Sequence, residues 1–224
     1  MYDLAPTKLK VVPLNRETLQ ERVYRQICDL ILDGEIVPGQ LVTIQAMADA
    51  FGVSHMPVRE ALKRLASANV LTVVSGRSIG IPQLSRDRLM DLYNVRLEVE
   101  PLAGAWAAKR ISPDELEFLQ EECQELKESG ASENVKTYLR ANRAFHFSIY
   151  RAARSESLLA IIENLWLQIG PYLNLLRGTG NLSVSDRHHQ RMLECLRARD
   201  EAGTRQAVRA DIEDAYDVLL KLLT

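Results

Sequence analysis

The chain has 224 residues and a formal net charge of −2, with 28 Lys and Arg against 30 Asp and Glu. This length allows two modest domains or one large one, and the near-neutral charge excludes a generic polyanion binder. No apolar run approaches the roughly 20 residues of a membrane span, and the N-terminus lacks a secretory signal, which predicts a cytoplasmic protein with no membrane partner. Three widely spaced cysteines argue against a disulfide framework.

The first elements along the chain are helices, after an N-terminal arm over residues 1–14. A helix is predicted over residues 18–33, because Thr18 and Glu21 match a capping box and Gly34 favours a stop. The following stretch, "VPGQLV", indicates a turn.

Two further helices and a hairpin follow. Thr43 is expected to cap a short helix, and Ser54 a longer one that runs to about Ala68. The stretch "LTVVSGRSIGIPQL" then predicts two short strands around Gly76. A short helix, a turn, a second helix and a hairpin form a winged helix-turn-helix, which we assign to residues 15–83.

The helix after Ser54 has one basic face and one apolar face. At about 100° per residue, His55, Arg59 and Lys63 gather on one side. The opposite side carries the apolar residues Val58, Ala61, Leu62 and Leu65. Such a helix can enter a major groove, where Arg59 binds guanine or a phosphate. Taken alone, the segment is also compatible with a solvated basic helix surface.

Two longer stretches indicate the family. "ADAFGVSHMPVREALKRLASANVLTVVSGR" and "LILDGEIVPGQLV" resemble the winged helix-turn-helix of GntR-family bacterial transcription regulators. The resemblance implies binding to double-stranded operator DNA, with contacts at Gln45, His55, Arg59 and Gly76, and with Arg77 beside Gly76 at the wing tip. Family members often have arginine at the positions of Gln45 and His55, which implies a shallower salt dependence or an altered half-site here.

From residue 84 to residue 224 the pattern is helical throughout. Amphipathic helices are predicted at about 86–110, 113–129, 133–153, 156–177, 184–198 and 200–223. The fold class is therefore mainly α, with an N-terminal winged helix-turn-helix and a C-terminal all-α bundle. We expect this second domain, residues 84–224, to bind an effector and to dimerise.

Polar residues interrupt the apolar faces of three of these helices. Asn142 and His146 lie in the middle of one apolar stripe, His189 in another, and Asp211 in a third. Buried polar groups need partners, and two imidazoles with a carboxylate and a carbonyl oxygen suit zinc, nickel or manganese. A hydrogen-bonded core cluster without metal is the alternative.

The helical part is similar to the FCD effector-binding domain of the FadR subfamily of GntR regulators. In that pattern the metal ligands are an Asp or Asn, a His four residues later, and two later residues that are usually His. The resemblance places them at Asn142, His146, His189 and Asp211. Asn142 is neutral and Asp211 replaces an imidazole, so metal choice is expected to differ.

Arg96 also lies on an apolar stripe. It is a candidate clamp for the carboxylate of a small organic acid, and the alternative is a structural pair with Glu98 or Glu100. Trp166 is expected to pack in the core. Further candidates for the effector pocket are Tyr150, Tyr172, Asn174 and Arg177.

The predicted function is a homodimeric, ligand-responsive regulator, in the first instance a repressor, that binds a pseudo-palindromic operator. Two alternatives from other classes stay open. One is a metal-dependent enzyme that acts on a small organic acid at His146, His189 and Asp211. The other is a DNA-binding dimer whose helical domain is purely structural.

Overall fold

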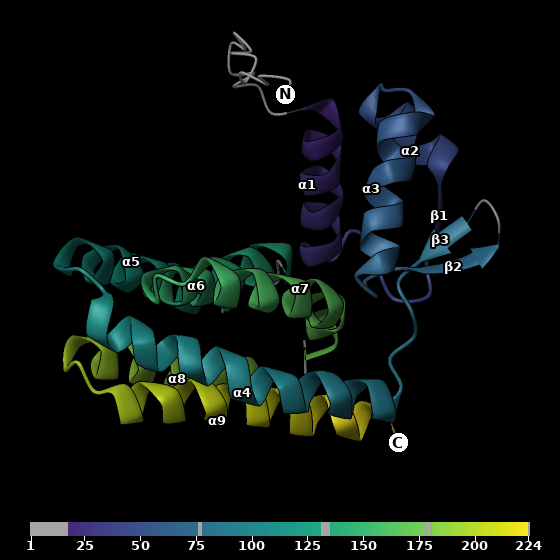
Figure 1. Ribbon diagram of the computed structural model, residues 1–224. Helices are drawn as coiled ribbons and strands as arrows, with labels where there is room; N and C mark the ends of the chain where they lie inside the picture. The colour runs from purple at the N-terminus through teal and green to yellow at the C-terminus, as the bar shows by residue number, and fades with distance from the viewer. Residues whose placement is uncertain (1–17, 76–77, 131–134, 177–178, 180, 224) are drawn as a thin grey trace, which may run out of the picture.

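The structure is a computed structural model that describes residues 18–75, 78–130, 135–176, 179 and 181–223. Over these residues the protein is mainly helical. A small N-terminal unit stands on one end of a larger helical part, in which the helices run roughly parallel to one another (Figure 1). No described helix is long and apolar enough to cross a membrane.

The N-terminal unit combines helices with a small antiparallel sheet. Its elements are α1 (Leu19–Leu32), β1 (Leu41–Thr43), α2 (Ile44–Phe51), α3 (His55–Ser67), β2 (Thr72–Ser75) and β3 (Ser78–Gly80). The three strands described lie in the order β1-β3-β2. The predicted hairpin strands are confirmed. The turn predicted over "VPGQLV" covers only the first part of that stretch. Its end, from Leu41, pairs with β3 as an edge strand.

Side-chain caps begin two of the three N-terminal helices. The Thr18 hydroxyl accepts a hydrogen bond from the N–H of Glu21, and the Thr43 hydroxyl caps α2 in the same way. Ser54 holds the N-cap position of α3, but its side chain accepts no cap hydrogen bond within the described chain. The third residue of that helix is Pro57, which has no N–H to donate. The N-cap position predicted for Ser54 is therefore confirmed, without the side-chain hydrogen bond that Thr18 and Thr43 accept.

The C-terminal part contains the predicted helices. They are α4 (Arg86–Arg110), α5 (Pro113–Gly130), α6 (Val135–Ala152), α7 (Glu156–Leu173), α8 (Asn181–Arg197) and α9 (Glu201–Leu222). The helix α7 ends earlier than predicted and continues as the 3-10 turn η1 (Asn174–Leu176). Helices α4 and α9 pack along each other beneath α6 and α7, and α8 packs against α5 and α9 (Figure 1).

One hydrophobic core continues across the boundary between the two parts. Ile27 of α1 and Leu62 of α3 belong to the same cluster as Ile169 of α7 and Leu219 of α9. Within it, the Tyr172 hydroxyl donates to the carbonyl of Pro82 at 2.5 Å. Apolar packing, at about 25 cal/mol per Å² buried, thus holds the N-terminal unit in a defined position on the helical part.

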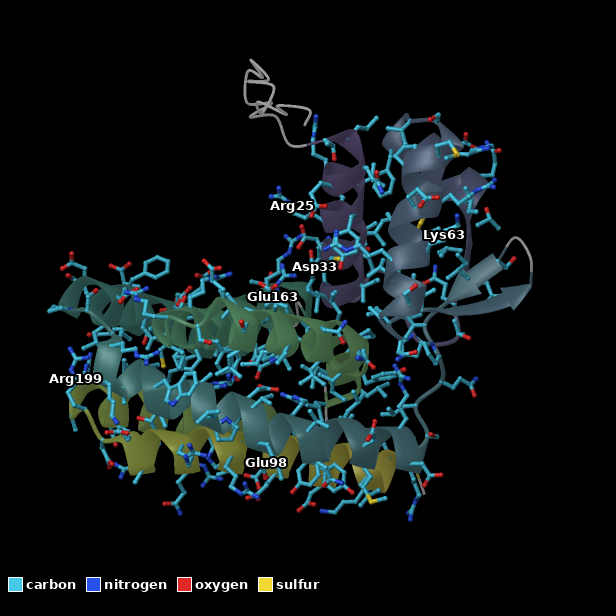
Figure 2. All side chains as sticks on the ribbon, in the orientation of Figure 1. Arg25, Asp33, Lys63, Glu98, Glu163 and Arg199 are labelled. Atoms are coloured by element: carbon cyan, nitrogen blue, oxygen red, sulfur yellow. The ribbon has the colours of Figure 1, made fainter. Side chains whose placement is uncertain are left out.

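Ion pairs add to this boundary at the C-terminal end of α1. Arg140 of α6 donates to Asp33 from two of its nitrogens, and Arg143 lies 3.2 Å from Asp29. Lys136 of α6 pairs with Glu35 just beyond α1. Figure 2 shows Asp33 where α1 meets the helical part. One face of α6 therefore contacts the N-terminal unit directly.

Candidate functional site

The first candidate site is the outer face of α3. His55, Arg59 and Lys63 are exposed there, whereas Val58 and Leu62 are completely buried on the opposite face. Apolar spacing of this kind forces the basic side chains outward once the helix packs. Figure 2 shows Lys63 among the side chains that surround α3.

The basic side chains of α3 differ in whether they form hydrogen bonds or ion pairs within the protein. The Lys63 amine pairs with Glu60 at 3.0 Å, while Arg59 makes no hydrogen bond or ion pair with any residue that the structure describes. Arg64 pairs with Glu21 and lies 3.7 Å over the ring of Tyr24, so it fastens α3 to α1. Arg59 is therefore the guanidinium on this face that is free to bind a base or phosphate.

Among the other predicted DNA contacts, the one that the structure describes lies on the neighbouring helix α2. Gln45 is exposed on α2, and its amide donates to Asp49 at 2.7 Å. Met56 follows His55 at the start of α3 and is 60% exposed, a large apolar side chain that the sequence reasoning did not select. Gly76 and Arg77 lie outside the described residues.

The second candidate site is a buried cluster in the helical part. His146 of α6, His189 of α8 and Asp211 of α9 bring their ligand atoms within 4.8 Å of one another. Nε2 of His146 lies 3.2 Å from Nε2 of His189 and 3.4 Å from Oδ2 of Asp211. The two histidines are 2% and 1% exposed. Three helices that are distant in sequence thus converge on one point, as their polar interruptions predicted.

The environment sets the charge of these groups. Burial lowers the pKa of His189 to about 3, so its imidazole is neutral near pH 7. Burial alone would raise the pKa of the Asp211 carboxyl, but its contacts with the His146 and His189 imidazoles and with the Ser185 hydroxyl lower it below its ordinary value. Ser185 also donates to Asp211, at 2.5 Å. A neutral imidazole beside an ionised carboxylate is the protonation state in which both bind a divalent metal.

A small cavity of about 30 Å³ adjoins the cluster, which is room for only a few water molecules. It is lined by Arg96, Tyr138, Leu139, Asn142, His146, Trp166, Leu173, Leu176, Ser185, Asp211, Ile212 and Ala215. The predicted fourth ligand, Asn142, is thus beside the same space as His146 and Asp211. Tyr138 and Ser185 were not predicted to line it, and Trp166 does so as well as packing in the core.

Arg96 is buried at this cavity but is already paired. It donates to both carboxylate oxygens of Glu100, one turn later on α4. Burial would lower the pKa of Arg96, and the Glu100 charge more than offsets this and raises it. Glu98 is exposed and is not the partner (Figure 2). The sequence allows two roles for Arg96, a structural ion pair and a clamp for an effector carboxylate. The ion pair, with Glu100, is present, and the arginine also lines the cavity.

The remaining effector candidates do not share one site. Tyr150 is buried against His146, with its hydroxyl 3.2 Å from Nδ1 of that imidazole, and does not line the cavity. Tyr172 belongs to the core between the two parts, and Asn174 lies against Gly34. The prediction that Tyr172 and Asn174 line the pocket is not met, because the end of α7 turns toward α1. Arg177 lies outside the described residues.

Comparison with known proteins finds a family match for each of the two parts of the chain. The model of the gntR family of bacterial regulatory proteins matches residues 19–81, and that of the FCD domain matches residues 91–214. The HTH-type transcriptional regulator McbR of Escherichia coli (strain K12) is 30% identical over 178 residues, which span 78% of this chain and 80% of McbR. The solved structure of E. coli McbR/YncC has a TM-score of 0.87 at 26% identity, over 93% of this chain and 100% of that one.

A second similar protein is described by its name as a repressor. The probable D-xylose utilization operon transcriptional repressor of Paenarthrobacter nicotinovorans is 26% identical, over 84% of this chain and 82% of that protein. A helix-turn-helix unit joined to a helical domain with a buried polar cluster therefore defines a bacterial transcription regulator, not an enzyme. The chain belongs to the GntR family and carries an FCD domain, as its sequence resemblance predicted.

Proposed function

We propose that the protein is a homodimeric repressor of the GntR family that releases a pseudo-palindromic operator when a metal-assisted carboxylic acid binds its helical domain. The observation that carries this proposal is the cluster of His146, His189 and Asp211, because His146 lies on the helix α6 that also contacts the N-terminal unit. Two copies of α3 would read the two half-sites of the operator.

The ligand set fits a divalent ion. Metal bonds of about 2.0–2.2 Å in tetrahedral geometry separate neighbouring ligand atoms by about 3.3–3.6 Å. Nε2 of His146 lies 3.2 Å from Nε2 of His189 and 3.4 Å from Oδ2 of Asp211, and Nε2 of His189 lies 3.8 Å from the other carboxylate oxygen, Oδ1. Asn142 lines the adjoining cavity and would add a neutral oxygen ligand. A bound zinc, nickel or manganese ion would attract an anionic effector, which Arg96 and the cavity residues would orient.

Arg96 keeps a hydrogen-bonding group for such an effector. Glu100 accepts from Nε and from one terminal nitrogen, which leaves the second terminal nitrogen for a ligand carboxylate. The cavity of about 30 Å³ is small, so an effector larger than a few water molecules would displace the side chains that line it. Ligand binding is thereby tied to a movement of α6 and its neighbours.

The helix α6 offers a route from this site to the DNA. Asn142 and His146 of α6 line the cavity, while Arg140 and Arg143 of the same helix hold the end of α1 at Asp33. In turn α1 packs against α3. A shift of α6 would therefore change the placement of the recognition helix, with a coupling of typically 1–3 kcal/mol.

The test uses the whole chain and an operator that is selected in vitro from random DNA duplexes of about 30 base pairs. We expect ultracentrifugation to give a dimer that binds this duplex, and fluorescence anisotropy to show roughly 5- to 150-fold weaker binding when zinc and a small carboxylic acid such as citrate, lactate or acetate are added together. A monomer on DNA, or operator affinity that no acid changes, would contradict the proposal.

The small cavity and the occupied Arg96 favour one competing function, a DNA-binding dimer with a purely structural helical domain. A thermal-shift screen separates the two. An effector-binding domain gains about 2.7 kcal/mol of stability at a ligand concentration of 100 times Kd, and a structural domain gains none from metals or acids.

A further inference from the structure

Glu100 is the most completely buried charged side chain in the described part of the protein, at 0% exposure. Its carboxylate accepts hydrogen bonds from Arg96, from Nε1 of Trp166 at 3.0 Å and from the hydroxyl of Tyr150 at 2.6 Å. A carboxylate removed from water is ionised only when it is paired, and Arg96 supplies the opposite charge. Glu100 is therefore a hydrogen-bond acceptor and not a donor.

The Tyr150 hydroxyl stands between Glu100 and His146. It lies 2.6 Å from Oε2 of Glu100 and 3.2 Å from Nδ1 of His146. A phenol has one O–H, and Tyr150 donates it to the carboxylate of Glu100, because an ionised carboxylate can only accept hydrogen bonds. The Tyr150 oxygen is then left as an acceptor toward His146, so that Nδ1 of the imidazole must carry the hydrogen.

We propose that Glu100 is a positioning residue for the metal site: through Tyr150 it holds His146 in the tautomer whose Nε2 is unprotonated and faces His189 and Asp211. This inference rests on the proposed metal site. A neutral imidazole binds a metal through the nitrogen that has no hydrogen, and the hydrogen bond at the other nitrogen selects the tautomer. In the opposite tautomer, His146 would present an N–H to the ion.

The two imidazoles of the cluster differ in this respect. Nδ1 of His189 is buried and has no hydrogen-bond partner in the part of the protein that is described. Nε2 of His189 lies 3.3 Å from the Ser185 hydroxyl. Among the described residues, no carboxylate therefore holds Nδ1 of His189 as Glu100 holds that of His146. The helix α4, which contributes no metal ligand, thus prepares one ligand from α6 before the ion binds.

The experiment compares the full-length wild type with Tyr150→Phe, which removes only the hydroxyl. Nitrogen-15 chemical shifts of the metal-free protein report the tautomer, and His146 is assigned among the four histidines by its own substitution with Gln. We expect the Nδ1–H form in the wild type and a mixture in the variant. Calorimetry with zinc chloride should show about 10- to 100-fold weaker binding by Tyr150→Phe.

Tyr172→Phe is the matched control. Tyr172 is also fully buried, but its hydroxyl donates to the Pro82 carbonyl, away from the cluster. We expect the wild-type tautomer and zinc affinity in this variant. A general effect of losing a buried hydroxyl would lower zinc binding in both variants and would overturn the proposal.

Two further outcomes would overturn it separately. An Nε2–H tautomer of His146 in the wild type, or unchanged zinc affinity of a folded Tyr150→Phe, would refute the role of Glu100 and Tyr150 while the metal site stands. A wild-type protein that binds its operator but no zinc would refute the metal site and this inference together, and would leave the DNA-binding function intact.

Discussion

The same residue types occur in two opposite environments in this protein. His55 and Arg59 are exposed on α3, without a partner among the residues described, whereas His146 and Arg96 are buried between helices and held by several. In water, the Arg59 guanidinium keeps its charge and its mobility and is available to DNA. In the core, the same groups form hydrogen bonds and ion pairs with fixed partners, and removing one partner leaves the other buried and unpaired.

The largest expected effect is at the buried cluster. Replacing His146 and His189 together with alanine should abolish stoichiometric metal, because a single carboxylate and an amide oxygen do not hold zinc or nickel tightly. Elemental analysis of the dialysed protein measures this. Replacing His55 and His188, which lie outside the cluster, should leave the metal content unchanged. Equal metal in both double variants would remove the distinction between buried and exposed histidines.

Arg96→Ala should be the most destabilising arginine substitution, by about 3–5 kcal/mol, because it leaves Glu100 charged and buried without its counter-ion. Urea denaturation monitored by circular dichroism measures the free energy of unfolding. Arg191→Ala breaks an exposed pair with Glu194, which water screens, and should cost far less stability than Arg96→Ala. The double replacement Arg96→Met with Glu100→Gln should recover most of the loss. Equal costs at Arg96 and Arg191 would contradict the difference in environment.

Arg59→Ala should act on DNA binding and not on folding. We expect a loss of about 1–3 kcal/mol in operator binding, with the unfolding free energy and the dimer unchanged. Fluorescence anisotropy at several salt concentrations measures the affinity and shows whether the contact is to a phosphate. Arg187→Ala changes an exposed arginine of the helical domain and serves as the control. Equal operator affinity in both variants would contradict the proposal that Arg59 of α3 contacts the operator.

The smallest expected effect is at the contact between the two regions. Arg140→Ala removes one of the two arginine partners of Asp33, whose side chain is 4% exposed, and should reduce the effector response of operator binding. Operator affinity is titrated with and without effector. Arg154→Ala breaks a comparable pair with Glu115, away from α1, and should leave the response unchanged. A full response in Arg140→Ala would exclude this route.

Local patterns predicted most of the fold. Periodic apolar residues and caps located the helices, and the apolar face of α3 alone dictated that Arg59 points outward. The strand from Leu41 was missed because three residues are too few to show alternation, and its partner β3 lies far along the chain. The missing cap at Ser54 has a local cause, Pro57, that the pattern of cap residues did not include.

The candidate metal site was predicted in part. The polar interruptions at His146, His189 and Asp211 indicated a common point, because a buried polar group needs a partner wherever the helices meet. Tyr138 and Ser185 gave no such signal, since a tyrosine or a serine on a helix is ordinary at either a surface or a core position.

The sequence by itself determined which residues are helical, which face of each helix is apolar and which polar side chains break that face. Only the tertiary structure decided how those faces meet. It paired Arg96 with Glu100, set Tyr150 against His146 and sent Tyr172 to the boundary with α1. The physical reason is that helical periodicity is a property of neighbouring residues, whereas the partner of a buried polar group depends on the packing of helices that are distant in the chain.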